Sequence, residues 1–584
     1  MQNNFFKKAQ ILKADISRET TNSIYGSDVT NSMAAYDAVA VLLNKNLPAK
    51  ARVLLDSSLQ KWPEDGKLRL INIDVLFAAS SAAEAVTYFM TLLESRGLEL
   101  WAIARLSKGL SGSKDLDGEM LLNLIDRVKN LEIEKKYLDQ LFAGIYKASR
   151  KEDRVSILKS IISATDSYAF KCRYAVSLFD SGQLDLALDY LECIHLKEPG
   201  TPISLLLHAN LLSNKGDFLK AIQLLERGNY KELLDAHCFR LLITLKQVEM
   251  QFREAGELLE FCLEKWPEDW ILIFRLNRSP LPAEIFQRIY KKLSAHWDEI
   301  PKKYGKLAYE YAITCMQAGE IQKSKNILLD VLNDSTCGFM ARNLLEGLNK
   351  EKFSHPIFKN SRFKDDRCSD FQLVKPLKPS KTAIIIFAMN SINDWPLEMI
   401  DAVLEDLNCN IIYLRDFKRK AFLGGVNSLG KSEDETIAKL REILEEMGVN
   451  KIITMGASFC GYAAIKYGAL LKSAHVLSFA GPNNLQTYYE DTPPSIWNYL
   501  YFIQLKTKRA EYSKGDLVHL ITDSTNTTFH QFYGEKHPQD KIQAERLSGL
   551  NNVCIIQLED LDDHSAVNLM MASNTLIDYL NRLI

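Results

Sequence analysis

Residues 451–466 read KIITMGASFCGYAAIK, and their order suggests how this part of the chain folds. An apolar, β-branched run leads into Gly456, and a helix-like stretch follows Gly461, so a strand should end at a tight bend where a helix begins. Ser458 lies at that bend. Its hydroxyl could cap the helix by accepting a bond from an N–H of the first turn. Alternatively, the bend could expose the hydroxyl as a nucleophile.

The neighbouring sequence predicts a parallel sheet around this bend. Short apolar runs rich in Ile and Val alternate with helical patterns at 383–387, 411–414, 452–454 and 476–479. Continuous apolar strands separated by helices indicate a sheet covered on both faces. Ligands bind outside the carboxyl ends of such strands, and Ser458 is placed at one of these ends.

The segment from Gly456 to Gly461 resembles the nucleophile elbow of the α/β-hydrolases, G-x-S-x-G. Gly456 and Ser458 match the motif, whereas Cys460 stands at the second glycine position, with Gly461 next to it. The resemblance implies an α/β-hydrolase-like domain over 381–584. The departure at Cys460 leaves both an active and a degenerate elbow open.

In this family the catalytic serine is followed along the chain by an acid and then by a histidine. His564 follows a strand-like run at 553–558 and precedes the final helix, so the resemblance implies that it is the catalytic base. The other histidines in this half are expected at core, strand or loop positions: His475, His519, His530 and His537.

The resemblance places the acid on the loop before the last strand, and Asp540 is our first choice. Asp540 could instead cap the helix predicted at 541–547, and Glu535 is the alternative acid. Two backbone N–H groups should form an oxyanion hole. The resemblance implies that Phe459 donates one of them and the loop after the first strand, at Met389, the other.

A triad of Ser458, Asp540 and His564 implies attack on an acyl carbonyl. We therefore expect a serine esterase or deacylase that acts on an acyl ester, which could be linked to a glycan, and that needs no cofactor or metal. An O-acyltransferase that modifies a bacterial surface polysaccharide and a non-catalytic adaptor remain alternatives. Residues 482–516 are rich in aromatic side chains and fall where the family inserts a lid.

The first 349 residues are predicted to form a helical repeat domain. The string KWPED occurs at 61–65 and at 265–269, and small residues recur at a spacing of 34 at Ala187, Ala221 and Ala255. Helix–turn–helix units of this length resemble the tetratricopeptide repeat. The resemblance implies a solenoid whose groove binds a protein or peptide partner, or a solenoid that builds a homo-oligomer or shields the next domain.

Composition narrows the classes of protein further. The chain has 584 residues and a net charge of −2, so no basic field recommends nucleic acid as a partner. Its 10 cysteines form no C-x-x-C motif, which predicts reduced thiols in a cytoplasmic protein. No signal peptide and no membrane-spanning run are predicted. Residues 350–380, rich in Lys, Arg and Pro, are predicted to be a linker.

Overall fold

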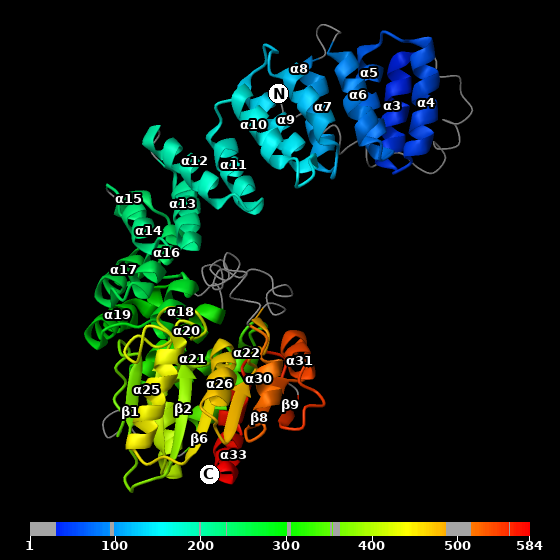
Figure 1. The fold of residues 1–584 in the computed structure, drawn as a ribbon. Coiled ribbons are helices and arrows are strands. Elements are labelled where there is room, and N and C mark those ends of the chain that lie inside the picture. The colour runs from blue at the N-terminus through cyan, green and yellow to red at the C-terminus, as the bar shows by residue number, and fades with distance from the viewer. Residues whose placement is uncertain are drawn as a thin grey trace. The chain divides into compact units, whose positions relative to one another are not determined.

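The computed structural model describes residues 31–93, 99–197, 200–228, 230–300, 305–350, 353, 362–389, 391–485, 515–559 and 561–584. The chain divides into two compact units, Met1–Pro199 and Gly200–Ile584. The first unit is helical. The second unit combines further helices with a β-sheet (Figure 1).

In the first unit the described residues form successive helices. They are α3 (Ser32–Asn44), α4 (Pro48–Lys61), α5 (Gly66–Ala78), α6 (Ala82–Leu92), α7 (Glu99–Ser111), α8 (Gly118–Val128), α9 (Lys135–Ala148), α10 (Arg154–Ala164), α11 (Tyr168–Asp180) and α12 (Leu184–Lys197).

Helices also form the first part of the second unit. They are α13 (Pro202–Lys215), α14 (Phe218–Leu225), α15 (Tyr230–Leu233), α16 (Ala236–Val248), α17 (Phe252–Lys265), α18 (Trp270–Arg278), α19 (Ala283–His296), the 3₁₀-helix η1 (Trp297–Glu299), α20 (Gly305–Gln317), α21 (Ile321–Asp330) and α22 (Gly338–Leu348).

The repeat positions have the structural roles that the 34-residue spacing predicts. Ala187, Ala221 and Ala255 are fully buried where neighbouring helices pack. Gly182 and Gly216 end α11 and α13 with φ of 82° and 92°, a left-handed conformation that favours glycine at helix ends. The tetratricopeptide-like helical array is therefore confirmed.

Among the described residues, seven strands form one sheet in the order β1-β5-β2-β6-β7-β8-β9, and β3 pairs with β4 in a small hairpin. Only β1 is antiparallel to its neighbour. This confirms the predicted mostly parallel α/β-hydrolase-like sheet. The strands are β1 (Phe371–Val374), β2 (Thr382–Ala388), β3 (Ser391–Ile392), β4 (Trp395–Pro396), β5 (Asn410–Arg415), β6 (Lys451–Ala457), β7 (His475–Phe479), β8 (Thr528–Gly534) and β9 (Val553–Leu558).

Helices cover both faces of this sheet. Leu440 of α25 (Glu433–Glu446) and Tyr462 of α26 (Phe459–Leu470) share a core with Phe529 on one face. On the other face, the ring of Tyr579 in α33 packs against Phe532 of β8, with ring centroids 5.1 Å apart. The helices of this region are α24 (Leu397–Leu404), the 3₁₀-helix η3 (Glu405–Leu407), α25 (Glu433–Glu446), α26 (Phe459–Leu470), α30 (Val518–Asp523), α31 (Pro538–Glu545), α32 (Ala566–Ala572) and α33 (Thr575–Leu583).

One part of the predicted linker at 350–380 belongs to the sheet instead. Phe371–Val374 forms the edge strand β1 and pairs with β5. Its first three residues are only half-buried and Pro376 follows closely, so the segment lacks the apolar run that marks the inner strands.

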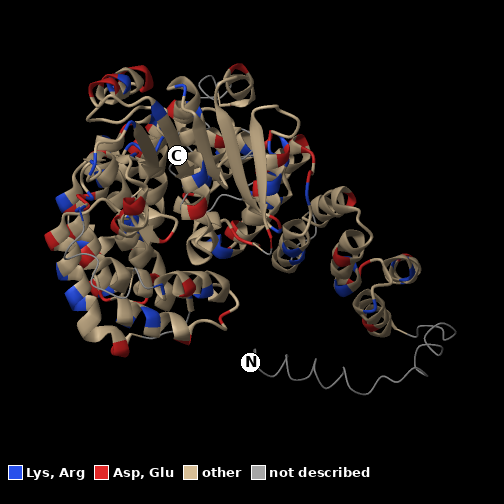
Figure 2. Cartoon of the chain, turned by 90° about the horizontal axis from the view of Figure 1, so that it is seen from below, with Lys and Arg blue, Asp and Glu red and all other residues tan. Residues whose placement is uncertain are grey.

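The charged residues are mixed in sign. Figure 2 shows Lys and Arg interspersed with Asp and Glu over the helices. Within the described ranges, no helix combines the length and the apolar character that crossing a membrane requires.

Candidate active site

Ser458 occupies a strained turn between β6 and α26. Its backbone has φ 57° and ψ −129°, in the half of the Ramachandran map that L-residues rarely enter. Ser458 is the N-cap residue of α26, but its side chain makes no capping hydrogen bond. The alternative in which the hydroxyl serves as a helix cap therefore does not match the structure.

Two glycines allow the strand and the helix to approach each other at this turn. A Cβ atom added to Gly456 would lie 2.2 Å from the carbonyl oxygen of Cys460. A Cβ added to Gly461 would lie 2.9 Å from the Cα of Gly481. Both clashes involve backbone, which cannot rotate away, so both positions require glycine. Cys460 is accommodated beside them as a buried side chain.

Asp540 and His564 are hydrogen-bonded although they lie 24 residues apart. The Nδ1 atom of His564 is 2.9 Å from each carboxylate oxygen of Asp540. Asp540 lies within α31, which begins at Pro538 with His537 as N-cap, so Asp540 does not cap this helix. An ionised carboxylate only accepts hydrogen bonds, which places the proton on Nδ1 and leaves Nε2 as an acceptor.

Asp540 is shared with a second imidazole. His537 Nδ1 lies 3.1 Å from Asp540 Oδ2. Burial opposes ionisation of Asp540, but the charge and hydrogen bonds of His564 and His537 outweigh it and lower the pKa of the carboxyl group. The same hydrogen bond to Asp540 raises the pKa of His537. His537, Asp540 and His564 also place ligand atoms within 4.8 Å of one another, in a cluster able to hold a metal ion.

Ser458 and His564 line the same cavity, which has a volume of about 490 Å³. This is within the usual range of small-molecule sites, ~300–1,000 Å³. His564 Nε2 is buried and has no hydrogen-bond partner in the described part of the chain, so no bond joins it to the Ser458 hydroxyl. Catalytic hydrogen bonds are often long before substrate binds, and an imidazole acceptor beside a cavity is available to a serine hydroxyl.

Both residues predicted to supply the oxyanion hole line this cavity. Phe459 begins α26 directly after Ser458, and Met389 follows β2. The buried guanidinium of Arg415 donates from Nε to the carbonyl oxygen of Met389 at 3.1 Å. Arg415 also pairs with Asp365, so a buried ion pair holds the backbone where β2 ends.

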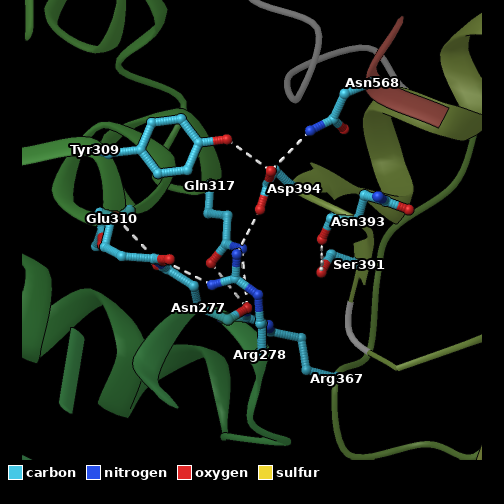
Figure 3. A network of polar contacts seen from close by, with 11 residues as sticks. Asn277, Arg278, Tyr309, Glu310, Gln317, Arg367, Ser391, Asn393, Asp394 and Asn568 are labelled. Atoms are coloured by element: carbon cyan, nitrogen blue, oxygen red, sulfur yellow. Dashed lines mark hydrogen bonds and ion pairs between the residues drawn. The ribbon is translucent and has the colours of Figure 1, made fainter. Parts of the chain in front are cut away.

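Helices of the array form the opposite wall of the cavity. Arg278 of α18 pairs with Asp394, which lies between β3 and β4, and with Glu310 of α20. Asp394 also accepts hydrogen bonds from Tyr309 at 2.6 Å and from Asn568 at 2.8 Å. Figure 3 shows Asp394 at the centre of these contacts. The loop after β2 is thereby joined both to the helical array and to α32.

Sequence reasoning missed this network. Its members come from distant segments, and Arg278 and Asp394 are 116 residues apart. No motif links them. One signal was present: Asn393 and Asp394 lie in the loop that follows the strand-like run at 383–387, at the sheet's carboxyl edge, where site residues gather.

The remaining predicted residues lie elsewhere or outside the description. His475 and His530 contact each other at 3.2 Å, and His530 also bonds to the hydroxyl of Tyr579. These two histidines do not line the cavity. His519 is exposed on α30, and Glu535 follows β8 without lining the cavity. The predicted lid at 482–516 falls mostly outside the described residues, which stop at 485 and resume at 515.

No protein-family model matches the chain, and no curated protein does either. Solved structures similar to parts of it include mouse alpha/beta hydrolase domain-containing protein 10, with 17% identity over 36% of this chain and 94% of that protein, at a TM-score of 0.25. Esterase B of Lactobacillus rhamnosis has 10% identity over 44% and 96% of the two chains, at a TM-score of 0.28.

A tetratricopeptide repeat protein of Parabacteroides merdae is 11% identical over 53% of this chain and 98% of that protein, at a TM-score of 0.20. These likenesses are too weak to bear on function.

Proposed function

We propose that this protein is a serine hydrolase that cleaves acyl esters through Ser458, His564 and Asp540. The observation that supports it most is the hydrogen-bonded Asp540–His564 pair, whose imidazole lines the same cavity as Ser458 on its strained turn. A serine that served only as a helix cap would need neither the positive φ nor the buried carboxylate–imidazole pair.

The chemistry follows from these positions. The hydroxyl oxygen of Ser458 attacks the acyl carbonyl while its proton passes to His564 Nε2. His564 then gives this proton to the departing alkoxide, so that an alcohol leaves and an acyl-enzyme remains. Water repeats the sequence, with its proton taken by His564, and releases the carboxylic acid and the free serine. Asp540 fixes the tautomer and stabilises the imidazolium.

The N–H groups of Phe459 and Met389 are proposed to stabilise the oxyanion of each tetrahedral intermediate. Both residues line the same cavity as Ser458, and Arg415 anchors the carbonyl oxygen of Met389, one peptide unit beyond the proposed N–H donor. Removing one such donor typically costs about 3–4 kcal/mol in activation free energy.

Labelling with an uncharged fluorophosphonate tests this function. The native chain should be labelled, and Ser458→Ala should lose the label completely. Asp540→Asn should slow labelling about 10²–10⁴-fold, because the amide no longer holds the productive tautomer of His564.

Glu535→Gln is the matched control, since Glu535 is the alternative acid and does not line the cavity; it should label within about twofold of the native rate. A native chain that resists labelling would indicate an adaptor without catalysis. Transfer of an acyl group from a p-nitrophenyl ester to added glycans, rather than to water, would indicate an acyltransferase.

A further inference from the structure

Two arginines from different parts of the second unit line the candidate active-site cavity. Arg275 comes from α18 of the helical array, and Arg419 comes from the loop between β5 and α25. Lys306 of α20 lines the cavity as well. Neither arginine was singled out by a sequence motif, because the fold alone brings the two segments together.

The described hydrogen-bond partner of Arg419 is a neutral amide. Arg419 donates a hydrogen bond to the amide oxygen of Gln247 at 2.9 Å, and within the described ranges no ion pair involves it. Arg275 donates a hydrogen bond to the hydroxyl of Thr244. The Nζ atom of Lys306 lies 4.5 Å from the centre of the Trp270 ring.

The carboxylates of the cavity wall already have donors of their own. Glu310 and Asp394 share Arg278. Asp416 accepts hydrogen bonds from the backbone N–H groups of Lys420 and Phe422. Among the described residues, the cavity lining holds four cationic side chains against three carboxylates, so its net charge is positive.

The two guanidinium groups are close enough to repel each other. Burial, and then the charge of Arg419, lowers the pKa of Arg275 to about 9. Burial lowers the pKa of Arg419 to about 10, against the opposing charge of Asp416. Like charges held together away from water are costly, and a bound anion would relieve both their repulsion and their desolvation.

We propose that this cavity binds acyl esters that carry an anionic group, a carboxylate or a phosphate, and that Arg275 and Arg419 hold this group. Guanidinium groups suit such ligands because their planar donors match carboxylate and phosphate oxygens. The inference rests on the proposed function for its ester chemistry, whereas anion binding itself does not depend on catalysis.

Paired substrates test the specificity. The kcat/KM of p-nitrophenyl hemisuccinate should exceed that of the uncharged p-nitrophenyl pentanoate at least tenfold. In Arg419→Gln this ratio should fall at least tenfold, and Arg419→Lys should restore part of it. Arg582→Gln, at an exposed arginine of α33, is the matched control and should leave the ratio unchanged. Equal values for the two esters in the native chain, or a ratio that Arg419→Gln does not move, would overturn the proposal.

Calorimetry with Ser458→Ala separates this proposal from the proposed function, because binding needs no nucleophile. Succinate and inorganic phosphate are titrated separately, which distinguishes a carboxylate site from a phosphate site. At least one of them should bind, with a Kd that rises tenfold or more when Arg419→Gln is added. Binding of neither anion, or the same Kd in both variants, would refute the anion site. Anion binding without any ester turnover would support the anion site and would contradict only the proposed hydrolase function.

Discussion

Ser458 adopts a backbone conformation that costs free energy, since a side chain at φ 57° and ψ −129° is crowded against its own peptide groups. Strain of this kind typically amounts to about 1–3 kcal/mol. The Ser458 hydroxyl forms no capping hydrogen bond that would offset this cost. The strain is therefore expected to serve function rather than stability.

Replacing Ser458 by glycine should make the protein more stable and inactive. Glycine removes the backbone strain, which stabilises the folded chain. Its greater freedom in the unfolded chain offsets part of this gain, so the free energy of unfolding should rise by about 1 kcal/mol. Ser458→Ala keeps the strain and should not share this gain. Chemical denaturation of both variants gives the comparison. A glycine variant no more stable than the alanine variant would show that the turn is unstrained.

His537 should make stability depend on pH. Its pKa is raised in the folded chain, first by the hydrogen bond to Asp540, so its contribution is complete below the unfolded value of about 6.5 and is lost as pH rises through the folded value. The Tm difference between the native chain and His537→Asn should therefore be largest near pH 6 and should shrink toward pH 8. The exposed His519→Asn is the control. A Tm difference that grows with pH would contradict the raised pKa of His537.

At the scale of elements, the packing of β6, α26 and β7 depends on Gly461. The added methyl group of Gly461→Ala would lie 2.9 Å from the backbone of Gly481 and 2.8 Å from the Ser478 hydroxyl. The helix must move away, so the free energy of unfolding should fall by about 1–3 kcal/mol, and Ser458 should label more slowly.

Gly112→Ala is the matched control, because among the described residues a Cβ there would approach only a carbonyl oxygen, at 3.6 Å. The free energy of unfolding of this variant should differ from that of the native chain by less than about 0.5 kcal/mol. If both alanine variants behaved alike, close packing at Gly461 would not matter.

The sequence predicted strands that carry a continuous apolar run. The strand expected at 553–558 forms at Val553–Leu558. Asp540 and His564, which were chosen from the chain order of the resembling family, form a hydrogen bond. The edge strand β1 escaped prediction because its short, half-exposed sequence has no apolar run.

Contacts that depend on tertiary packing could not be predicted. The pairing of Arg278 with Asp394 joins an array helix to the loop after β2, and neither residue belongs to a periodic pattern. The same holds for Arg275 and Arg419, which the fold brings to one cavity. The catalytic role of Ser458 remains a prediction, since it concerns reactivity rather than position.

At the scale of the whole molecule, the sheet region and the last helices of the array depend on each other. The side chain of Trp395 is fully buried, and its ring stacks on Phe353 with centroids 5.6 Å apart. Lys350 donates to the carbonyl oxygen of Met571 at 2.6 Å. A cut between the helices and the sheet would expose this indole, at a cost of about 4 kcal/mol.

Truncation tests this dependence. A fragment of residues 200–584 should fold cooperatively and label at Ser458 within about twofold of the full chain, because it keeps the whole second unit. A fragment of residues 362–584 should aggregate or fail to label. In this fragment Asp394 lacks Arg278 and Tyr309, and Trp395 lacks the residues that cover its ring. Size-exclusion chromatography measures aggregation, thermal melts monitored by circular dichroism measure cooperative folding, and fluorophosphonate measures labelling at Ser458.

A single substitution in the full chain makes the same test without removing any segment. A Cβ added to Gly347 of α22 would lie 2.6 Å from the ring of Trp395, so Gly347→Leu should push this helix away from the loop after β2. Labelling should then slow although every proposed catalytic residue is present. A fully labelled 362–584 fragment together with an unaffected Gly347→Leu variant would mean that the sheet region builds its site without the array.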